Sequence, residues 1–390
     1  MTTTERDTVQ DFEDFRGHVL DRDPFVAFLE YREREPFWVD DGREKFWVIT
    51  RYEQVREVQQ DYRTFAHGLT SNYGMPPEHP LMPSDFDPPY QTKLRSVVLP
   101  HMSSAKMGTL EPKMHQVCRD LIDSLKGRGS CDLQPEFAQV YPITMFSDFF
   151  GLPADRREEF RRLADTWSHD FSQKPAMWAA IRAVVREQME ERLDSPRDDM
   201  LSGVVHGEID GERIDIDVAV NLASTVFLGG LDSVPATIGW VWRYLADHPD
   251  VRRRIVEDPA CIPNAVEEFL RVFPAVARNG GVATRDVDFH GAAIKAGDRV
   301  RNYISLANQD SAVFDDPLTL NFDRPANKHI AFSAGSHRCL GSHLVRHELA
   351  VALQEWHAQI PDYRVAEPDK IIFIGGGVLS IDALPLEWDV

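Results

Sequence analysis

The segment Phe332-Ser-Ala-Gly-Ser-His-Arg-Cys-Leu-Gly341 places one cysteine in a glycine-containing loop, directly before an amphipathic helix predicted over 342–357. A thiolate at a helix N-terminus is stabilised by the helix dipole and by free backbone N–H groups, so we expect the pKa of Cys339 to be lowered. Gly335 and Gly341 are expected to let the backbone pass close to a large flat ligand. The segment therefore predicts a thiolate that binds a metal or a metal-containing group.

A zinc site is the alternative interpretation of the same segment. Cys339, His343 and His347 recur every four residues, and His337 lies beside them. Structural zinc sites usually draw a ligand pair from each of two places, and no second cluster of this kind occurs in the sequence. Zinc is therefore the less favoured interpretation.

Length, net charge and cysteine content limit the partners, the location and the number of domains that we expect for this protein. The chain has 390 residues and a formal net charge of −20, which disfavours nucleic acid and acidic lipid surfaces as partners. The N-terminal residues contain no apolar core of the kind that a signal peptide needs, so we expect a cytoplasmic protein. No linker or shift of composition marks a boundary, and we expect one domain over 1–390. The other cysteines are isolated and are interpreted as plain structural or surface thiols in a reduced compartment: Cys118, Cys131 and Cys261.

Periodicity predicts a mainly α fold with a small β component. A short helix over 23–34 begins at Asp23 and Pro24, and two short strands joined by a turn are predicted over 36–39 and 46–50. Residues 65–90 are expected to form a long functional loop because they are rich in proline. Helices are predicted over 104–126, 155–168, 176–193, 217–246, 249–257 and 263–273.

The helix predicted over 217–246 is apolar nearly all round, which indicates either a buried helix or a membrane span. The membrane alternative is disfavoured by three polar residues in it, Asn221, Asp232 and Arg243. Two glycines and Pro235 weaken its centre, and a buried helix that is weakened at one place usually has a functional reason. Asp232 and Ser233 lie beside that place and could deliver protons through water to a bound oxygen species.

The pattern Phe-x-x-Gly-x-His-x-Cys-x-Gly in 332–341 resembles the haem-binding signature of the cytochrome P-450 family. One position departs from it, because Ser333 stands where the family usually has glycine. The resemblance implies a b-type haem with Cys339 as the axial ligand of its iron, whose thiolate pushes electron density onto the iron. Phe332 and Gly341 are then expected to lie against the haem near the sulfur.

Gly229-Gly-Leu-Asp-Ser233 resembles the oxygen-activation segment of that family, with Ser233 in place of the usual threonine. The resemblance implies that Asp232 and Ser233 are catalytic and that Leu228 and Gly229 face the substrate. His79 aligns with a substrate-binding tyrosine of the family, and is expected either to hydrogen-bond the substrate or to face water.

Glu268 and Arg271 form a Glu-x-x-Arg pair that, with Arg324, resembles the family's structural motif, and these three are expected to support the haem pocket. The haem propionates are expected to be bound by three further residues, Gln91, Arg95 and His337. A third propionate-binding arginine is common in the family on the strand after the Glu-x-x-Arg helix. Counting back from Phe289 puts Gly281 at that place, and the nearest arginine, Arg278, is three residues out of register.

The resemblance extends over nearly the whole chain and is nearest to the bacterial camphor hydroxylase branch of soluble enzymes. It implies a triangular-prism fold with a long central helix and a proximal haem-thiolate loop. It also implies oxygen-dependent monooxygenation of a small apolar substrate, a terpenoid or a substituted aromatic, by hydroxylation or O-dealkylation. Electrons would come from a [2Fe-2S] ferredoxin and its NAD(P)H-dependent reductase, docked on a local basic patch of Lys93, Arg95, Arg338 and Arg346. A peroxide-driven enzyme and a non-catalytic haem sensor are the alternatives.

Overall fold

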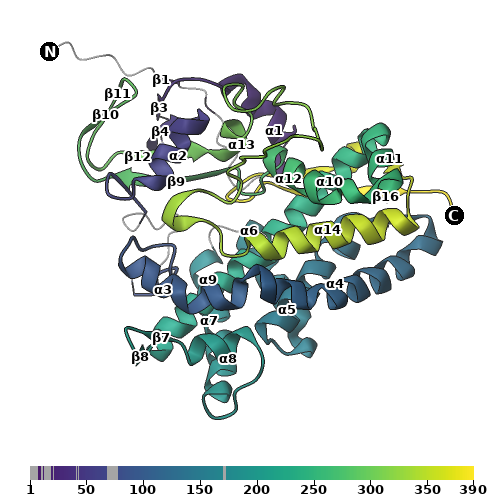
Figure 1. Ribbon diagram of the computed structural model, residues 1–390, viewed down its shortest axis with the longest axis horizontal. Coiled ribbons are helices and arrows are strands. Elements are labelled where there is room, and N and C mark those ends of the chain that lie inside the picture. Colours follow the sequence, from purple (N-terminus) through teal and green to yellow (C-terminus); the bar gives the residue numbers. More distant parts are fainter. Residues whose placement is uncertain are drawn as a thin grey trace.

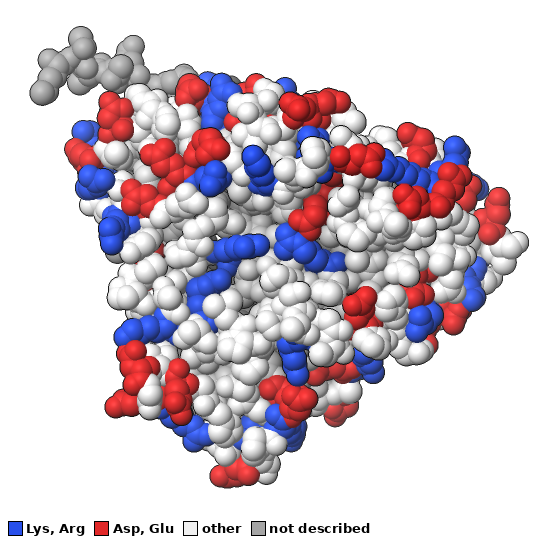
Figure 2. Space-filling model, in the orientation of Figure 1, with Lys and Arg blue, Asp and Glu red and all other residues white. Residues whose placement is uncertain are grey.

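The computed structural model describes residues 8–390 apart from 10, 11, 13–18, 21, 41, 43, 68–77 and 170–172, and describes no side chains at 8, 164, 165 and 167–169. Part of the predicted loop over 65–90 therefore lies outside the described residues. Helices dominate and the molecule has a roughly triangular outline (Figures 1 and 2). The mainly α fold with a small β component is confirmed.

The helical part is built around two long helices that lie side by side, α4 (Ser104–Leu125) and α14 (Ser342–Gln359), although they are far apart in the sequence (Figure 1). Helix α14 matches the helix predicted after the cysteine loop. The remaining helices of this part are α3 (Tyr90–Val98), α5 (Val140–Phe150), α6 (Arg157–His169), α7 (Lys174–Asp194), α8 (Met200–Val205), α9 (Ile216–Leu231), α10 (Ser233–Asp247), α11 (Pro249–Glu257) and α12 (Ile262–Val272).

A six-stranded sheet occupies the opposite corner of the molecule, with the order β1-β3-β4-β12-β9-β5 (Figure 1). Helices α2 (Tyr52–Gln60) and α13 (Ile304–Ala307) lie beside it. Its strands are β1 (Thr8–Val9), β3 (Phe37–Asp40), β4 (Lys45–Ile49), β5 (Phe65–Ala66), β9 (Arg278–Ala283) and β12 (Arg299–Tyr303).

The other described strands form four small sheets, two of them three-stranded. One three-stranded sheet joins β15 (Ser380–Ala383), β14 (Ile372–Ile374) and β2 (Val19–Leu20), and another joins β13 (Arg364–Val365), β16 (Pro385–Glu387) and β6 (Ser130–Asp132). Two hairpins complete them, β7 (Glu208–Ile209) with β8 (Glu212–Arg213), and β10 (Val287–Phe289) with β11 (Ala292–Ile294).

The predicted helix over 217–246 is two helices, because α9 ends at Leu231 and α10 begins at Ser233. The break lies at Asp232, three residues before Pro235, whose missing N–H and bulky ring disfavour a continuous helix. Residues 216–247 have a window of mean hydropathy 1.3 that would suit a membrane span, but 67% of that window is buried inside the protein. The apolar surface of this segment is therefore used in the protein core, as the sequence predicted.

Three other differences from the prediction have local causes. The helix expected over 23–34 is a single α turn, α1 (Pro24–Ala27), capped by the Asp23 carboxylate and followed by a 3-10 turn over Phe28–Tyr31. Helix α5 was not predicted, because most of its positions are buried and few polar residues mark a solvent-facing side. Helix α2 was not predicted either, and its N-cap, Arg51, offers no side-chain cap.

Candidate functional site

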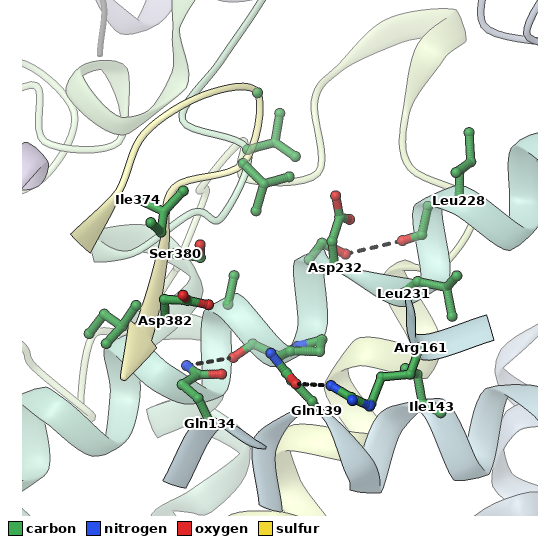
Figure 3. Close-up of a pocket in the computed structure, with 18 of the residues that line it drawn as sticks. Gln134, Gln139, Ile143, Arg161, Leu228, Leu231, Asp232, Ile374, Ser380 and Asp382 are labelled. Carbon is green, nitrogen blue, oxygen red and sulfur yellow. Dashed lines mark hydrogen bonds between the residues drawn. The ribbon is translucent and has the colours of Figure 1, made fainter. Parts of the chain in front are cut away.

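A cavity of about 300 Å³ lies between the cysteine loop and the break in the central helix. Its apolar wall comes from α9, from the segment after α12 and from the β14–β15 hairpin, with Leu228, Leu231, Val276, Ile374, Val378 and Ile381. Its polar end gathers Gln134, Gln139, Arg161 and Asp382, whose side chains converge in Figure 3. Cys339, Gly229, Asp232 and Ser233 also line it. The cavity thus brings the predicted thiolate and the predicted proton-delivery pair to one space.

The cysteine loop is closed by a hydrogen bond that the N–H of Cys339 donates to the carbonyl of Phe332, 2.8 Å away. Ser333 has a left-handed backbone (φ 63°), which explains why glycine suits this position, and its hydroxyl accepts a hydrogen bond from Asn279 at 3.2 Å. Arg346 stacks on the ring of Phe332 at 4.6 Å. The loop is therefore fixed by both strand β9 and helix α14.

The two glycines of the loop have different roles. Gly335 has φ +72°, and a Cβ there would lie 2.5 Å from the carbonyl oxygen of Gln59. A glycine is needed at position 335 because α2 packs closely against it, and not because of a ligand as the sequence suggested. At Gly341 a Cβ would meet the Cys339 sulfur and the Met102 side chain only at 3.8 Å, so the protein itself leaves room there.

Desolvation by the surrounding protein raises the pKa of the Cys339 thiol, although the residue is exposed toward the cavity. The N–H of Gly341 and the positive charge of Arg95 act in the opposite direction. The predicted lowering is therefore wrong for the protein alone. A metal ion bound to the sulfur would supply the missing charge, since coordination deprotonates a thiol outright.

Donors predicted to bind the propionates gather at one edge of the loop. Gln91 is buried and donates to the carbonyl of Ser336 at 2.6 Å, and Arg95 donates to the carbonyl of Arg338 at 2.7 Å. His337 lies 3.3 Å from the carboxylate of Asp87. All three predicted residues therefore contact the cysteine loop or belong to it. Arg278 instead donates to the carbonyl of Gly376 at 2.8 Å.

The break in the central helix presents polar groups to the cavity. The hydroxyl of Ser233 donates to the carbonyl of Gly229 at 3.1 Å, one turn before it. Asp232 caps the break with a backbone that has left the regular helix (φ −113°) and keeps its carbonyl bonded to the N–H of Ala236 at 3.1 Å. An acid and a hydroxyl are thereby held next to each other at the cavity wall, an arrangement suited to proton transfer.

The two glycines of this segment, Gly229 and Gly230, have different roles. A Cβ at Gly229 would meet no atom within 4 Å, so this residue leaves open space in the cavity. A Cβ at Gly230 would lie 2.4 Å from the ring of Phe146, so this residue allows α5 to pack against α9. Only Gly229 is thus available to face a ligand.

Sequence reasoning missed the positive charges of this wall. Lys174, the first residue of α7, is 4% exposed and lines the cavity. Burial lowers its pKa to about 8, against an opposing effect of the Asp232 carboxylate. Arg161 lines the same wall and donates to Gln139 at 3.3 Å and to Glu158. A lysine or arginine in a helix is normally solvated, and no pattern in the sequence reveals which ones tertiary packing buries.

His79 does not join the other predicted substrate-binding residues. Leu228 and Gly229 line the cavity, but the described cavity wall does not include His79. The carbonyl of His79 accepts a hydrogen bond from the indole N–H of Trp178 at 2.8 Å. The contact described for His79 is therefore made by its backbone carbonyl and not by its imidazole.

Glu268, Arg271 and Arg324 form a buried cluster, as expected for a structural role. The Glu268 carboxylate accepts from Arg271 at 2.8 and 2.9 Å and from Arg324 at 2.8 Å. Arg271 also donates to three backbone carbonyls of the following segment, those of Asn308, Pro317 and Thr319. Burial acts to raise the pKa of Glu268, but these partners lower it below its ordinary value.

The zinc alternative gains no support. In the described part of the chain, the one group of three close metal-ligand side chains is His67, Asp87 and His337, and it contains neither Cys339 nor the other two histidines proposed for zinc. One of these, His347, pairs with Glu111 at 3.6 Å.

The residues present fit a haem. A lone cysteine faces a cavity with a mostly apolar wall, and its neighbour Gly341 leaves space beside the sulfur. Arg95 and His337, which suit buried carboxylates, lie at the edge of the same loop. When bound, a haem held by thiolate supplies the activation of oxygen at its iron. The chain's own residues would hold it through Cys339 and orient it through Gln91, Arg95 and His337.

Comparison with known proteins identifies the family. The family model for cytochrome P450 matches residues 261–356. The chain is 35% identical over 353 residues to probable cytochrome P450 127A1 of Sinorhizobium fredii (strain NBRC 101917 / NGR234), covering 89% of this chain and 84% of that protein. It is 30% identical to nocardicin C N-oxygenase of Nocardia uniformis subsp. tsuyamanensis, covering 88% and 90%.

Solved structures agree with the relatives. The crystal structure of cytochrome P450 CYP101C1 superposes with a TM-score of 0.89 at 30% identity, covering 99% of this chain and 98% of that one. CYP101J2 gives a TM-score of 0.88 at 28% identity, covering 98% and 97%. These neighbours support the camphor-type branch expected from the sequence. The chain belongs to the cytochrome P450 family and is a bacterial cytochrome P450 monooxygenase.

Proposed function

We propose that this enzyme is a cytoplasmic monooxygenase with haem b that hydroxylates or O-dealkylates a small, mostly apolar substrate, a terpenoid or a substituted aromatic. The observation that carries the proposal is the shared cavity, in which Cys339 lies on one wall and Asp232 and Ser233 line another. The wall beside them is largely aliphatic, which favours recognition by shape and apolar contact. The relatives' names range from a steroid C26-monooxygenase to a mycinamicin IV hydroxylase/epoxidase, so family membership alone does not choose a substrate.

The chemistry assigned to the chain's own residues is proton handling. Asp232 exchanges protons at its carboxylate, and it lies close enough to Lys174 for their charges to interact. Ser233 passes a proton at its hydroxyl, which its bond to the Gly229 carbonyl keeps oriented along the cavity wall. Leu228 and Gly229 position the substrate, and the aliphatic wall excludes bulk water.

A [2Fe-2S] ferredoxin with its NAD(P)H-dependent reductase is the proposed electron source. Figure 2 shows Lys and Arg side chains gathered near the middle of the face that carries the cysteine loop, α3 and α14, on a protein of net charge −20. Two of the four basic residues expected there are paired with acids, Lys93 with Asp210 and Arg346 with Glu267. Arg338 is exposed and has no acidic partner within ion-pair distance among the described residues, which supports it as the first contact for an acidic ferredoxin.

Two measurements test this function. The reduced, carbon monoxide-bound protein should show the red-shifted thiolate absorption band, and Cys339→Ala should abolish it; its absence from the unmutated protein would defeat the ligand assignment. Product formation with ferredoxin, reductase and NAD(P)H is then compared with peroxide alone. Turnover that depends only on peroxide would support the alternative, a peroxide-driven enzyme. No turnover in either assay across a panel of terpenoids and aromatics would favour a haem sensor.

A further inference from the structure

His67 is a buried imidazole for which the proposed mechanism has no use. It is 7% exposed and its ring stacks on that of His337, with ring centroids 4.1 Å apart and planes 24° apart. Its backbone N–H donates to the Asp87 carboxylate at 3.0 Å, so both its backbone and its ring are fixed. A buried, oriented imidazole of this kind usually has a ligand or a structural partner to serve.

The position of His67 in the sheet is the second observation. It directly follows β5, which pairs antiparallel with β9 so that Ala66 faces Val282. The next position on β5, His67, is therefore opposite Gly281, and side chains opposite each other in an antiparallel pair lie on the same face. Gly281 is the position at which the sequence analysis expected, and did not find, a third propionate-binding arginine.

That face of β9 is turned toward the cysteine loop. Asn279, two residues before Gly281 and hence on the same face, donates to Ser333 of the loop at 3.2 Å. Arg278 lies on the opposite face of the strand, which explains why it bonds to Gly376 instead. Gly281 could not easily carry any side chain, because a Cβ there would lie 3.0 Å from the carbonyl oxygen of Ala66.

A shared metal ion does not explain the cluster of His67, Asp87 and His337, although their ligand atoms lie within 4.8 Å of one another. The lone pair of an imidazole nitrogen lies in the plane of its ring. Two rings that are stacked nearly parallel cannot both direct these lone pairs at one ion. The Asp87 carboxylate lies at one edge of the stack, 3.3 Å from Nε2 of His337 and 3.9 Å from Nδ1 of His67, and a second carboxylate can accept an N–H from the other ring nitrogen of His67.

We propose that His67 is an additional haem-binding residue that donates its ring N–H to a haem propionate and takes the place of the arginine absent at 281. This inference rests on the proposed haem binding. Burial, aided by the neighbouring His337, lowers the pKa of His67 to about 4 against the opposing effect of Asp87, so at neutral pH the ring is an uncharged donor. Arg95 is then the permanent cation near the propionates, and hydrogen bonds from uncharged donors provide their remaining stabilisation.

The test is the rate at which the haem-loaded enzyme releases haem to an excess of apomyoglobin. His67→Phe keeps the ring and removes the donor, and should speed release at least about tenfold, the lower end of the effect of a hydrogen bond to a charged group. His67→Gln keeps a donor and should stay within about threefold of the unmutated rate. His67→Leu replaces the Phe variant if that does not fold. Equal rates for the Phe and Gln variants would overturn the proposal.

A matched control separates propionate binding from support of the fold. The same proteins are reconstituted with haem dimethyl ester, whose propionates carry no charge, and the effect of His67→Phe should largely disappear. An undiminished effect would mean that His67 only supports the loop. Failure of the unmutated protein to bind haem at all would refute the proposed function itself, a result distinct from either outcome.

Discussion

Removing the Glu268 carboxylate should cost this enzyme several kcal/mol of stability. Glu268 is 1% exposed and Arg271 is fully buried. The carboxylate accepts from five donors, which belong to Arg271 (two), Arg324, Asn321 and Asn327. In Glu268→Ala, two guanidinium groups lose their counter-charge inside the protein. Breaking a buried pair in this way costs about 3–5 kcal/mol.

The chain provides a control at the same helical spacing. Glu53 and Arg56 are also three residues apart and lie 3.1 Å from each other, but the Glu53 side chain is 71% exposed. Exposed pairs contribute about 0–1 kcal/mol, so Glu53→Ala should leave stability almost unchanged. The two variants differ in burial and not in spacing, and the expected gap between them is about 3 kcal/mol.

The assay is urea unfolding of the haem-loaded proteins at one haem concentration, because a ligand that binds only the folded state adds to its stability. Far-ultraviolet circular dichroism reports the helices, and haem absorbance reports the pocket. The pKa of Glu268 is lowered in the folded state, so its contribution is present above the ordinary carboxyl pKa of about 4.3 and is lost as the pH falls through the folded value. A loss below about 1 kcal/mol at pH 7 for Glu268→Ala would refute the reasoning.

Three further substitutions test separate parts of the site. Gly230→Ala should destabilise by about 1–3 kcal/mol because its Cβ would overlap Phe146, whereas Gly229→Ala should not; thermal unfolding that ranks them in reverse would contradict the packing argument. Burial holds the pKa of Glu348 well above its ordinary range, so as the pH rises above about 4.3 the unmutated protein should lose stability relative to Glu348→Gln; parallel stability curves between pH 5 and 8 would disprove this. Ser333→Ala should cost about 1 kcal/mol by losing the Asn279 bond while keeping the left-handed strain, and Ser333→Gly should be nearly neutral; equal melting temperatures for these two variants would argue against that balance.

Patterns that repeat along the chain allowed most helices to be predicted, and α4, α11 and α14 begin and end within two residues of their expected bounds. Helix α5 was not predicted, because most of its positions are buried and few polar residues mark a solvent-facing side. Pro235 indicated that the central helix is weak, but the position of the break depends on hydrogen bonds that only the folded backbone reveals.

The residues of the site also differ in how far they could be predicted, according to whether their role depends on nearby or on distant parts of the sequence. The residues within one motif, from Phe332 to Gly341, could be proposed from the sequence because the chemistry of the loop is local. The pKa of Cys339 was predicted in the wrong direction, because the helix N-terminus is visible in the sequence and the desolvation by the folded protein that outweighs it is not. Lys174 and His67 gave no signal, since each becomes important only through a neighbour distant in the sequence, Asp232 and His337.

The cavity has a consequence for how this protein is made. Its wall includes both Leu81 and Asp382 on β15, so segments far apart in the sequence are needed to enclose it. Cys339 lies between them in the sequence. A cavity bounded in this way does not exist until synthesis has passed β15, so a shorter growing chain offers no finished pocket to its cofactor. Loss of the last strands would open the cavity even with every residue of the cysteine loop intact.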